Sequence, residues 1–185
     1  VRRTRKWLQE AILSLMLEKP FTRISIAEIT NQAQVSRPTF YLHYRNKEEV
    51  LEDYLDSMYK NFMIDMQPYL DSIIQGKMAI KFFEQIADQA VFLRSLIDSE
   101  VSYLVMQKLH RYCYDVIKQS LDQPPFPSME DKTWDFVIAS IAGSVYAISI
   151  RWLQMDMPKT PKEMGELTML LIRPGIREML TQGRE

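Results

Sequence analysis

Apolar residues recur every three to four positions along most of this sequence, which is the spacing of amphipathic helices. The first such segment runs from about Thr4 to Glu18, and Pro20 is expected to end it because proline cannot continue a helix. A long helix is expected to start at Lys47, where Asn46 and the acidic residues that follow resemble a capping box. Helical spacing continues through the second half, so the chain is predicted to be all-α.

Helix-breaking residues divide the rest of the chain. Pro68 and Gly76 mark the first breaks, and the proline-rich segment 123–128 is predicted to be a loop. The helices expected between these breaks span 78–97 (one helix and a shorter one), 100–121, 132–154 and a last segment after Pro161. We expect the last helix to break at Pro174 and Gly175.

The helix expected at 132–154 is apolar on nearly every side, which favours a central position or an interface. Its uncharged run, 137–150, is too short to span a bilayer, so no membrane partner is expected. Small residues at 142–144 would let another helix approach closely. Together with the apolar stripe at 164–171, this helix predicts a homodimer held by a four-helix interface.

Two short helices joined by a tight turn are predicted near the N-terminus. Ser25 and Glu28 form a capping box that starts the first helix. Ser36 is a favourable N-cap for the second helix, whose first turn tolerates Pro38. The second helix carries Arg, Thr, Tyr and His near its start, which are residue types that contact phosphates and bases. This arrangement is a helix-turn-helix and predicts double-stranded DNA as a partner.

The charges of the chain are unevenly distributed. Residues 1–47 hold nine Lys and Arg against three Glu, a balance of +6, although the whole chain has a formal net charge of −1. The remaining residues therefore hold 14 basic and 21 acidic side chains, a balance of −7. A basic N-terminal segment on an acidic remainder localises the affinity for phosphate, which supports a DNA-binding function.

The sequence shows no catalytic set. It lacks a nucleophile–base–orienter group, a paired-carboxylate motif and a glycine-rich phosphate loop, so we expect no enzyme activity and no cofactor. Cys113 excludes an intramolecular disulfide, because it is the single cysteine. His110 lies one helical turn from it, but no further ligand is near in sequence, so no metal site is expected. No signal peptide is visible, and a cytoplasmic location is expected.

The segment 35–50, which begins Val-Ser-Arg-Pro-Thr-Phe-Tyr-Leu-His-Tyr, resembles the signature of the TetR/AcrR family of transcriptional regulators. The specific match covers about residues 4–60, and the stretch 150–164 resembles a body type common in Firmicutes members. The resemblance implies a three-helix helix-turn-helix head at 1–47, and a helical bundle at 48–185 that binds an effector and dimerises.

The same resemblance implies roles for individual side chains. It places Arg37, Pro38 and Leu42 at base edges, gives phosphate contacts to Thr39, Tyr41, His43 and Lys47, and adds donors from Ser25 and Ser36. Arginine can read guanine with two hydrogen bonds, and proline and leucine offer apolar surface to a thymine methyl. The alternative is that Arg37 is a solvated surface residue and that Tyr41 and His43 pack inside the protein.

Two positions depart from the family pattern. The family usually has glycine at position 34, where the turn between the two helices favours a left-handed residue. Gln34 there is expected to cost on the order of 1–2 kcal/mol or to force a different turn. Position 27 is Ala27, so a base contact from an arginine at that place is absent, and readout should depend more on Arg37.

The body, residues 48–185, is rich in aromatic residues and methionines, which suit an apolar or aromatic effector. The candidate pocket residues are Phe62, Met66, Phe82, Tyr103, Met106 and Trp134, although each alone is more often a core residue. The predicted function is that of a repressor released from a pseudo-palindromic operator by a small molecule. The alternatives are a co-regulator of the same fold that acts mainly through protein contacts, and a helical enzyme.

Overall fold

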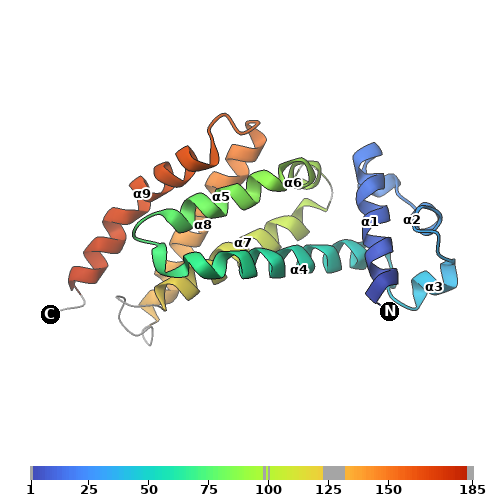
Figure 1. Cartoon of the computed structure of the whole chain (residues 1–185), viewed down its shortest axis with the longest axis horizontal. Coiled ribbons are helices and arrows are strands. Elements are labelled where there is room, and N and C mark those ends of the chain that lie inside the picture. Colours follow the sequence, from blue (N-terminus) through green and yellow to red (C-terminus); the bar gives the residue numbers. More distant parts are fainter. Residues whose placement is uncertain (1, 98, 100, 123–131, 183–185) are drawn as a thin grey trace. The chain divides into compact units, whose positions relative to one another are not determined.

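The chain forms helices throughout the part that the computed structural model describes, namely residues 2–97, 99, 101–122 and 132–182, without the side chains of Arg2, Trp134 and residues 179–182 (Figure 1). The loop expected at 123–128 lies outside the described residues. The all-α prediction is confirmed. The elements are α1 (Arg2–Glu18), η1 (Phe21–Arg23), α2 (Ile26–Gln32), α3 (Arg37–Tyr41), α4 (Lys47–Met66), η2 (Gln67–Ser72), α5 (Lys77–Asp88), α6 (Ala90–Ile97), α7 (Ser102–Leu121), α8 (Thr133–Gln154) and α9 (Pro161–Gln182).

The helices group into two compact units. The first unit holds Val1–Lys60 and Val91–Lys108, and the second holds Asn61–Ala90 and Leu109–Glu185. The predicted division of the chain after residue 47 coincides with the start of α4. The boundaries between the two units instead fall inside α4 and inside α7, so each of these helices contributes one part to each unit.

The core of the first unit forms around α1. The apolar face predicted for this helix, which includes Leu8, Ile12 and Leu15, is buried. Phe40 from α3 and Leu51 from α4 are fully buried as well. Later in the chain, Phe92 of α6 packs edge-to-face against Tyr54 of α4, with ring centroids 5.1 Å apart. The short helices α2 and α3 are therefore held on a larger framework of long helices.

The core of the second unit depends on a close approach of α5 and α9. A Cβ added at Gly165 of α9 would lie 2.7 Å from Cγ1 and 2.8 Å from Cα of Ile80 on α5. The two helices meet at a glycine because no larger residue fits there. Beside this contact, the Phe83 ring of α5 packs edge-to-face on Trp152 of α8 at 5.4 Å.

The last helix corrects one prediction from the sequence. We expected a break at Pro174 and Gly175, but α9 continues through both residues to Gln182. Pro174 and Gly175 are exposed, so a backbone carbonyl that loses its helical partner at the proline is not buried without a hydrogen bond. The side chain of Ile176 in the next turn is only 3% exposed, and its burial holds the helix in place after the proline.

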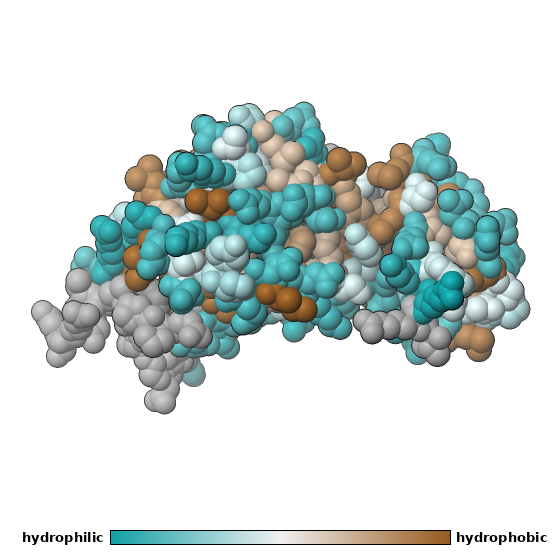
Figure 2. All heavy atoms as spheres, in the orientation of Figure 1, coloured by the Kyte–Doolittle hydropathy of each residue, from teal (hydrophilic) through white to brown (hydrophobic). Residues whose placement is uncertain are grey.

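Helix α8 is not surrounded on every side by the residues that the structure describes. Its buried positions, which include Ile138, Ala142 and Ser149, lie on one face, whereas Phe136 is 77% exposed. The uncharged run 137–150 was expected to be too short to span a bilayer, but the longer stretch Asp135–Gln154 of α8, among the described residues, has the length and composition to do so, and about a third of it is buried. The space-filling view shows other apolar side chains that reach the surface among hydrophilic ones (Figure 2). This pattern favours the interface position over the central one.

Candidate nucleic-acid interface

Two N-caps set the positions of the short helices α2 and α3. At the start of α2, the backbone N–H of Glu28 donates to Ser25 Oγ over 3.3 Å, and the Ser25 N–H donates to the Glu28 carboxylate over 2.9 Å. At the start of α3, the Thr39 N–H donates to Ser36 Oγ over 3.2 Å. The predicted capping box and the predicted N-cap are both confirmed.

The turn between the two helices uses a left-handed residue. Gln34 has a φ of 55°, so the expectation of left-handed backbone at this position is confirmed. The Gln34 N–H donates to the Asn31 carbonyl over 3.1 Å, and the Val35 N–H donates to the Thr30 carbonyl over 2.9 Å. These two bonds form a Schellman motif, which satisfies the last carbonyls of α2. The motif turns the chain sharply without a glycine.

Helix α3 buries one face and exposes the other. Phe40 is fully buried, and Tyr44, which follows the helix, is 3% exposed, so both belong to the core of the first unit. On the other face, Arg37 and Pro38 are exposed, Tyr41 is 58% exposed and Leu42 is 81% exposed. An 81% exposed leucine beside an exposed arginine suits contact with a partner that offers both polar and apolar groups, as base edges do.

The remaining side chains predicted to contact DNA differ in their exposure and in their hydrogen bonds. Ser25 and Ser36 are exposed, and Thr39 and His43 are partly buried. The Thr39 hydroxyl lies 2.7 Å from the Ser36 hydroxyl, so each is already paired with the other at the start of α3. Hydroxyls held in this way present their remaining lone pairs and protons at a fixed position.

Lys47 has a different environment from the one that the sequence suggested. Its ammonium group donates to the backbone carbonyls of Phe21 over 2.7 Å, Thr22 over 3.2 Å and Ile24 over 2.9 Å. The same nitrogen lies 4.5 Å from the centre of the Phe21 ring. All its N–H donors are therefore used inside the first unit. The geometry supports a positioning role for Lys47, rather than the direct phosphate contact implied by the resemblance.

A polar network that the sequence did not reveal connects three parts of the first unit: α1, Tyr44 in the segment that follows α3, and α4. Asp53 of α4 accepts hydrogen bonds from the Tyr44 hydroxyl over 2.6 Å and from Gln9 Nε2 over 2.6 Å. Arg5 forms an ion pair with the same carboxylate over 2.8 Å. Desolvation, helped by the hydrogen bond to Asp53, raises the pKa of Tyr44 to about 12, so the phenol remains a donor at neutral pH.

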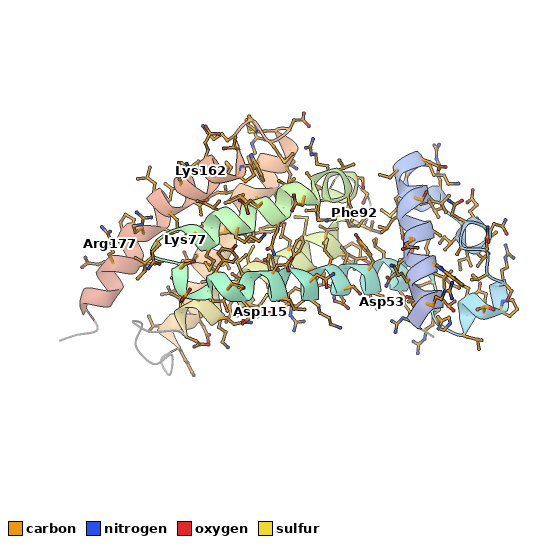
Figure 3. The ribbon with its side chains drawn as sticks, viewed as in Figure 1. Asp53, Lys77, Phe92, Asp115, Lys162 and Arg177 are labelled. Atoms are coloured by element: carbon orange, nitrogen blue, oxygen red, sulfur yellow. The ribbon has the colours of Figure 1, made fainter. Side chains whose placement is uncertain are left out.

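The network holds Tyr44, in the segment that follows α3, against the long helices α1 and α4. Asp53 of α4 is labelled in Figure 3. Tyr44 directly precedes Arg45 and lies two residues after Leu42, so fixing its ring and hydroxyl limits how α3 can rotate. The i and i+4 spacing of Arg5 and Gln9 on α1 was a sequence signal for a shared polar face. Nothing in the sequence, however, identified Asp53 as its partner.

A second ion pair holds α2. Lys19 and Glu28 form an ion pair, and Ser25 adds hydrogen bonds to the same carboxylate. Lys19 and then Ser25 lower the pKa of Glu28 to about 2, although Glu28 is at the surface. A lowered pKa means that the pair stabilises the folded state above the ordinary pKa of 4.5, and that this contribution is lost as the pH falls towards 2.

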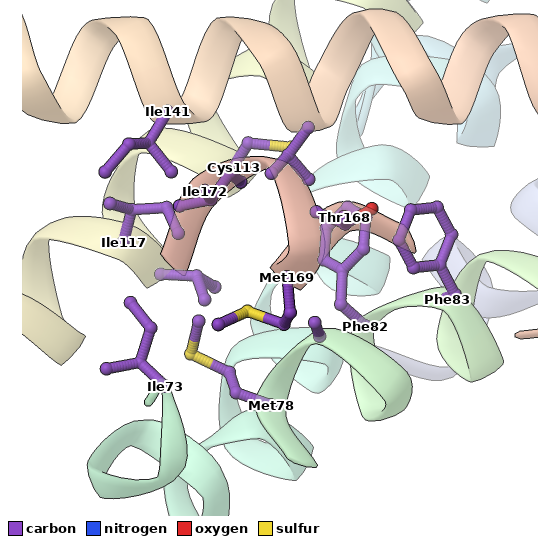
Figure 4. Close-up of a pocket in the computed structure, with 13 residues that line it drawn as sticks. Ile73, Met78, Phe82, Phe83, Cys113, Ile117, Ile141, Thr168, Met169 and Ile172 are labelled. Carbon is purple, nitrogen blue, oxygen red and sulfur yellow. The ribbon is translucent and has the colours of Figure 1, made fainter. Parts of the chain in front are cut away.

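A narrow cavity lies in the second unit (Figure 4). Of the candidate effector residues, Phe82 lines it, whereas Phe62 and Met66 are buried outside its lining. Tyr103 is 59% exposed and Met106 is 40% exposed, and both belong to the first unit. The Trp134 side chain lies outside the described residues. In the part of the chain that the structure describes, no three His, Cys, Asp or Glu residues lie close enough to hold a metal ion.

Comparisons with known proteins agree with this geometry. The family model described as "Bacterial regulatory proteins, tetR family" matches residues 8–54, and the one described as "Transcriptional regulator C-terminal region" matches residues 76–174. The uncharacterized HTH-type transcriptional regulator YxbF of Bacillus subtilis is 47% identical over 51 residues, which cover 27% of this chain and 13% of that protein. The chain therefore spans a small part of the length of the curated relative that it matches.

Solved structures resemble the chain over nearly its whole length. One, described as a TetR-family regulator from Syntrophomonas wolfei, is 18% identical, with a TM-score of 0.69 over 93% of this chain and 94% of that one. The dihydroxyacetone kinase operon activator DhaS is 17% identical, with a TM-score of 0.69 over 94% and 96%. The fatty acid degradation regulator FadR from Bacillus halodurans is 16% identical, with a TM-score of 0.66 over 94% and 96%. The C-terminal family model covers more than half of the sequence, and the chain belongs to the TetR family of DNA-binding transcriptional regulators.

Proposed function

We propose that the chain is a cytoplasmic homodimeric repressor whose head, residues 1–47, binds a pseudo-palindromic operator. The body, residues 48–185, binds a small apolar or aromatic effector that releases the DNA. The observation that carries the proposal is the exposed face of α3, where Arg37, Pro38, Tyr41 and Leu42 stand clear of the core after a tight turn. The family consists of transcription regulators, and we assign no enzyme activity to this member.

The proposal divides the exposed residues by what they contact. Arg37, Pro38 and Leu42 would read base edges, because arginine pairs with guanine and the two apolar side chains fit a thymine methyl. Tyr41, His43 and Thr39 would hold phosphates, with Ser25 and Ser36 as further donors. Lys47 would support these contacts indirectly, by fixing the backbone ahead of α2, because its three carbonyl partners lie in η1 and at the start of the segment that leads to α2.

Arg37→Ala is expected to weaken operator binding by about 1–3 kcal/mol and to relax the preference at one base position. The binding constant of the wild type should fall steeply with salt, with a log–log slope of about −0.9 for each phosphate neutralised. Fluorescence anisotropy with an operator selected from a random DNA library measures both effects. Arg111→Ala is the matched control, because Arg111 is an exposed arginine of α7 in the second unit. A salt-independent wild type, or equal losses in the two variants, would contradict DNA reading by α3.

The proposed dimer rests on large apolar side chains that are exposed in the described part of the chain. Phe136 of α8 is 77% exposed, and Leu170 and Leu171 of α9 are 71% and 63% exposed. A Cβ added at Gly143 of α8 meets no described atom within 4 Å, apart from its own neighbours and helix backbone. Two copies that paired through these helices would cover the apolar surface and give a four-helix interface. Their operator should contain half-sites about one helical turn, or a multiple of it, apart.

Gly143→Leu is expected to raise the dimer dissociation constant at least about tenfold, which corresponds to about 1.4 kcal/mol, because a large side chain would separate two closely packed copies of α8. Analytical ultracentrifugation over a range of concentrations measures this constant. Gln107→Leu adds a leucine at an exposed position of α7, and it should leave the constant unchanged. A monomeric wild type, or a Gly143→Leu dimer of unchanged affinity, would remove α8 from the interface.

Activation of transcription is a second candidate function. DhaS, which has a similar fold, is named as an operon activator, so this fold serves activators as well as other regulators. In vitro transcription from the selected operator, placed once over and once upstream of a promoter, distinguishes the two functions. Repression is expected when the operator overlaps the promoter. Increased transcription from the upstream position would favour activation.

A further inference from the structure

The cavity in the second unit has an almost entirely apolar wall. The space in it that the centre of a water-sized molecule can occupy is small, about 30 Å³, so a larger ligand has to widen it. The lining comes from the residue after η2 and from α5, α7, α8 and α9, and consists of Ile73, Met78, Ala79, Phe82, Phe83, Cys113, Val116, Ile117, Ile141, Val145, Thr168, Met169 and Ile172. Apart from the sulfurs of Met78 and Met169, of which that of Met78 accepts a hydrogen bond from Ser120 Oγ over 2.8 Å, the polar groups of this lining are the Thr168 hydroxyl and the Cys113 thiol (Figure 4).

Thr168 has an unpaired hydroxyl at this wall. Its side chain is 2% exposed, and its Oγ1 has no hydrogen-bond partner among the described residues. Other buried hydroxyls in the second unit behave differently. Ser120 Oγ donates to the Val116 carbonyl over 2.9 Å, and Ser149 Oγ donates to the Val145 carbonyl over 2.7 Å. A buried hydroxyl that lacks such a bond is unfavourable, unless a ligand supplies the partner.

The other polar group of the wall is uncharged. Cys113 is 1% exposed, and burial raises the pKa of its thiol, so the thiol stays protonated at neutral pH. No Asp, Glu, Lys, Arg or His side chain belongs to the described lining. Burying a charged group without a partner of opposite charge is strongly unfavourable. The wall therefore selects against carboxylates and ammonium groups.

We propose that the ligand of this cavity is an uncharged, mainly apolar molecule that carries one hydrogen-bonding group, and that it places this group against the Thr168 hydroxyl. The inference deepens the effector-binding role proposed above and rests on it. Met78 and Met169 face the cavity from α5 and α9. Because methionine side chains change shape at low cost, they allow the narrow space to widen around a ligand of several heavy atoms.

Three probes of similar size test the proposal: toluene has no hydrogen-bonding group, benzyl alcohol has one, and benzoate has a charge. The full chain, labelled at the methionine methyl groups, is titrated with each probe, and NMR shifts of Met78 and Met169 report binding in the cavity. Wild type is expected to bind benzoate at least about tenfold more weakly than benzyl alcohol. Thr168→Val keeps the shape and removes the hydroxyl. It should lower the ratio of benzyl alcohol affinity to toluene affinity about fivefold.

Two further variants, Thr168→Ser and Thr168→Ala, separate the effect of the hydroxyl from that of the side-chain shape. Thr168→Ser retains the hydroxyl and should retain the wild-type ratio, whereas Thr168→Ala should lower it as Thr168→Val does. Without ligand, Thr168→Val should unfold at a higher temperature than wild type, because it removes an unpaired buried polar atom. An unchanged ratio in both variants that lack the hydroxyl would overturn the proposal. So would benzoate binding as tight as that of benzyl alcohol, or the absence of shifts at Met78 and Met169 with every probe.

Operator binding is measured separately, so the two proposals fail in different ways. A chain that shows the expected probe preferences, but binds no DNA, would refute the regulatory function and leave the ligand chemistry standing. A chain that binds operator, but shows no change of the probe ratio on losing the hydroxyl, would refute the role of Thr168 alone. Bound benzyl alcohol should lower operator affinity by the same factor by which operator lowers benzyl alcohol affinity.

Discussion

Gly165→Ala is expected to destabilise the second unit by about 3 kcal/mol, because overpacking against an immobile neighbour costs about 1–3 kcal/mol and sometimes more. The added Cβ would lie 2.8 Å from both Cα and N of Ile80, and these backbone atoms cannot move aside as the end of a side chain can. For a chain of this length, such a loss lowers the midpoint of thermal unfolding by about 6–12 °C. Circular dichroism at 222 nm during heating measures the midpoint.

Gly175→Ala is the matched control for this prediction. Gly175 lies in the same helix, and an added Cβ there meets no described atom within 4 Å beyond its chain neighbours and its own helix backbone. Alanine favours a helix over glycine by about 1 kcal/mol, so this variant should be slightly more stable than wild type. The two substitutions are therefore expected to have opposite signs. Equal midpoints for the two variants would show that α5 and α9 do not meet closely at Gly165.

Lys47→Met is expected to destabilise the first unit by about 2–4 kcal/mol. It keeps the aliphatic part of the side chain but removes the ammonium group that bonds the carbonyls of Phe21, Thr22 and Ile24. Hydrogen bonds from charged groups contribute about 1.5–3 kcal/mol each, and water replaces part of this at a half-buried site. Chemical denaturation measures the loss, with Lys60→Met on the exposed side of the same helix as the control.

The same variant distinguishes a positioning role from a phosphate contact. A lysine that neutralises one phosphate would reduce the salt slope of DNA binding by about 0.9 when it is removed, without loss of stability. If Lys47 has a positioning role, its removal leaves the salt slope unchanged and lowers the affinity for DNA because α2 and α3 are no longer held in place. The slope is measured below the unfolding temperature of the variant. A reduced slope together with unchanged stability would restore the direct phosphate contact that the resemblance implies.

Features that depend on a few neighbouring residues could be predicted from the sequence. The capping box at Ser25 and the N-cap at Ser36 were predicted and are present, and the left-handed turn that the resemblance implied at position 34 is kept by Gln34. Each of them joins atoms at most five residues apart, so the local sequence alone specifies which groups can meet. The positions of Arg37 and Leu42 were implied by the resemblance, and the structure exposes both.

Features that join distant parts of the chain could not be predicted in this way. Lys47 meets carbonyls that lie 23 to 26 residues earlier, and Asp53 meets Arg5 and Gln9 across 48 and 44 residues. The candidate effector residues were chosen by type alone, and Phe82 is the one placed in the described lining of the cavity. Thr168, whose unpaired hydroxyl carries the ligand proposal, has no distinguishing sequence pattern.

By itself, the sequence determined the helical class of the chain and the helix-turn-helix, because periodicity, caps and turn residues act within one or two helical turns. Tertiary structure alone decided that Lys47 is held by carbonyls, that α9 continues past Pro174 and that α8 leaves apolar residues uncovered. These outcomes depend on which surfaces meet after folding. Burial of a distant partner such as Ile176 can outweigh a local helix-breaking preference, and a donor bonds whichever acceptor the packed helices bring near.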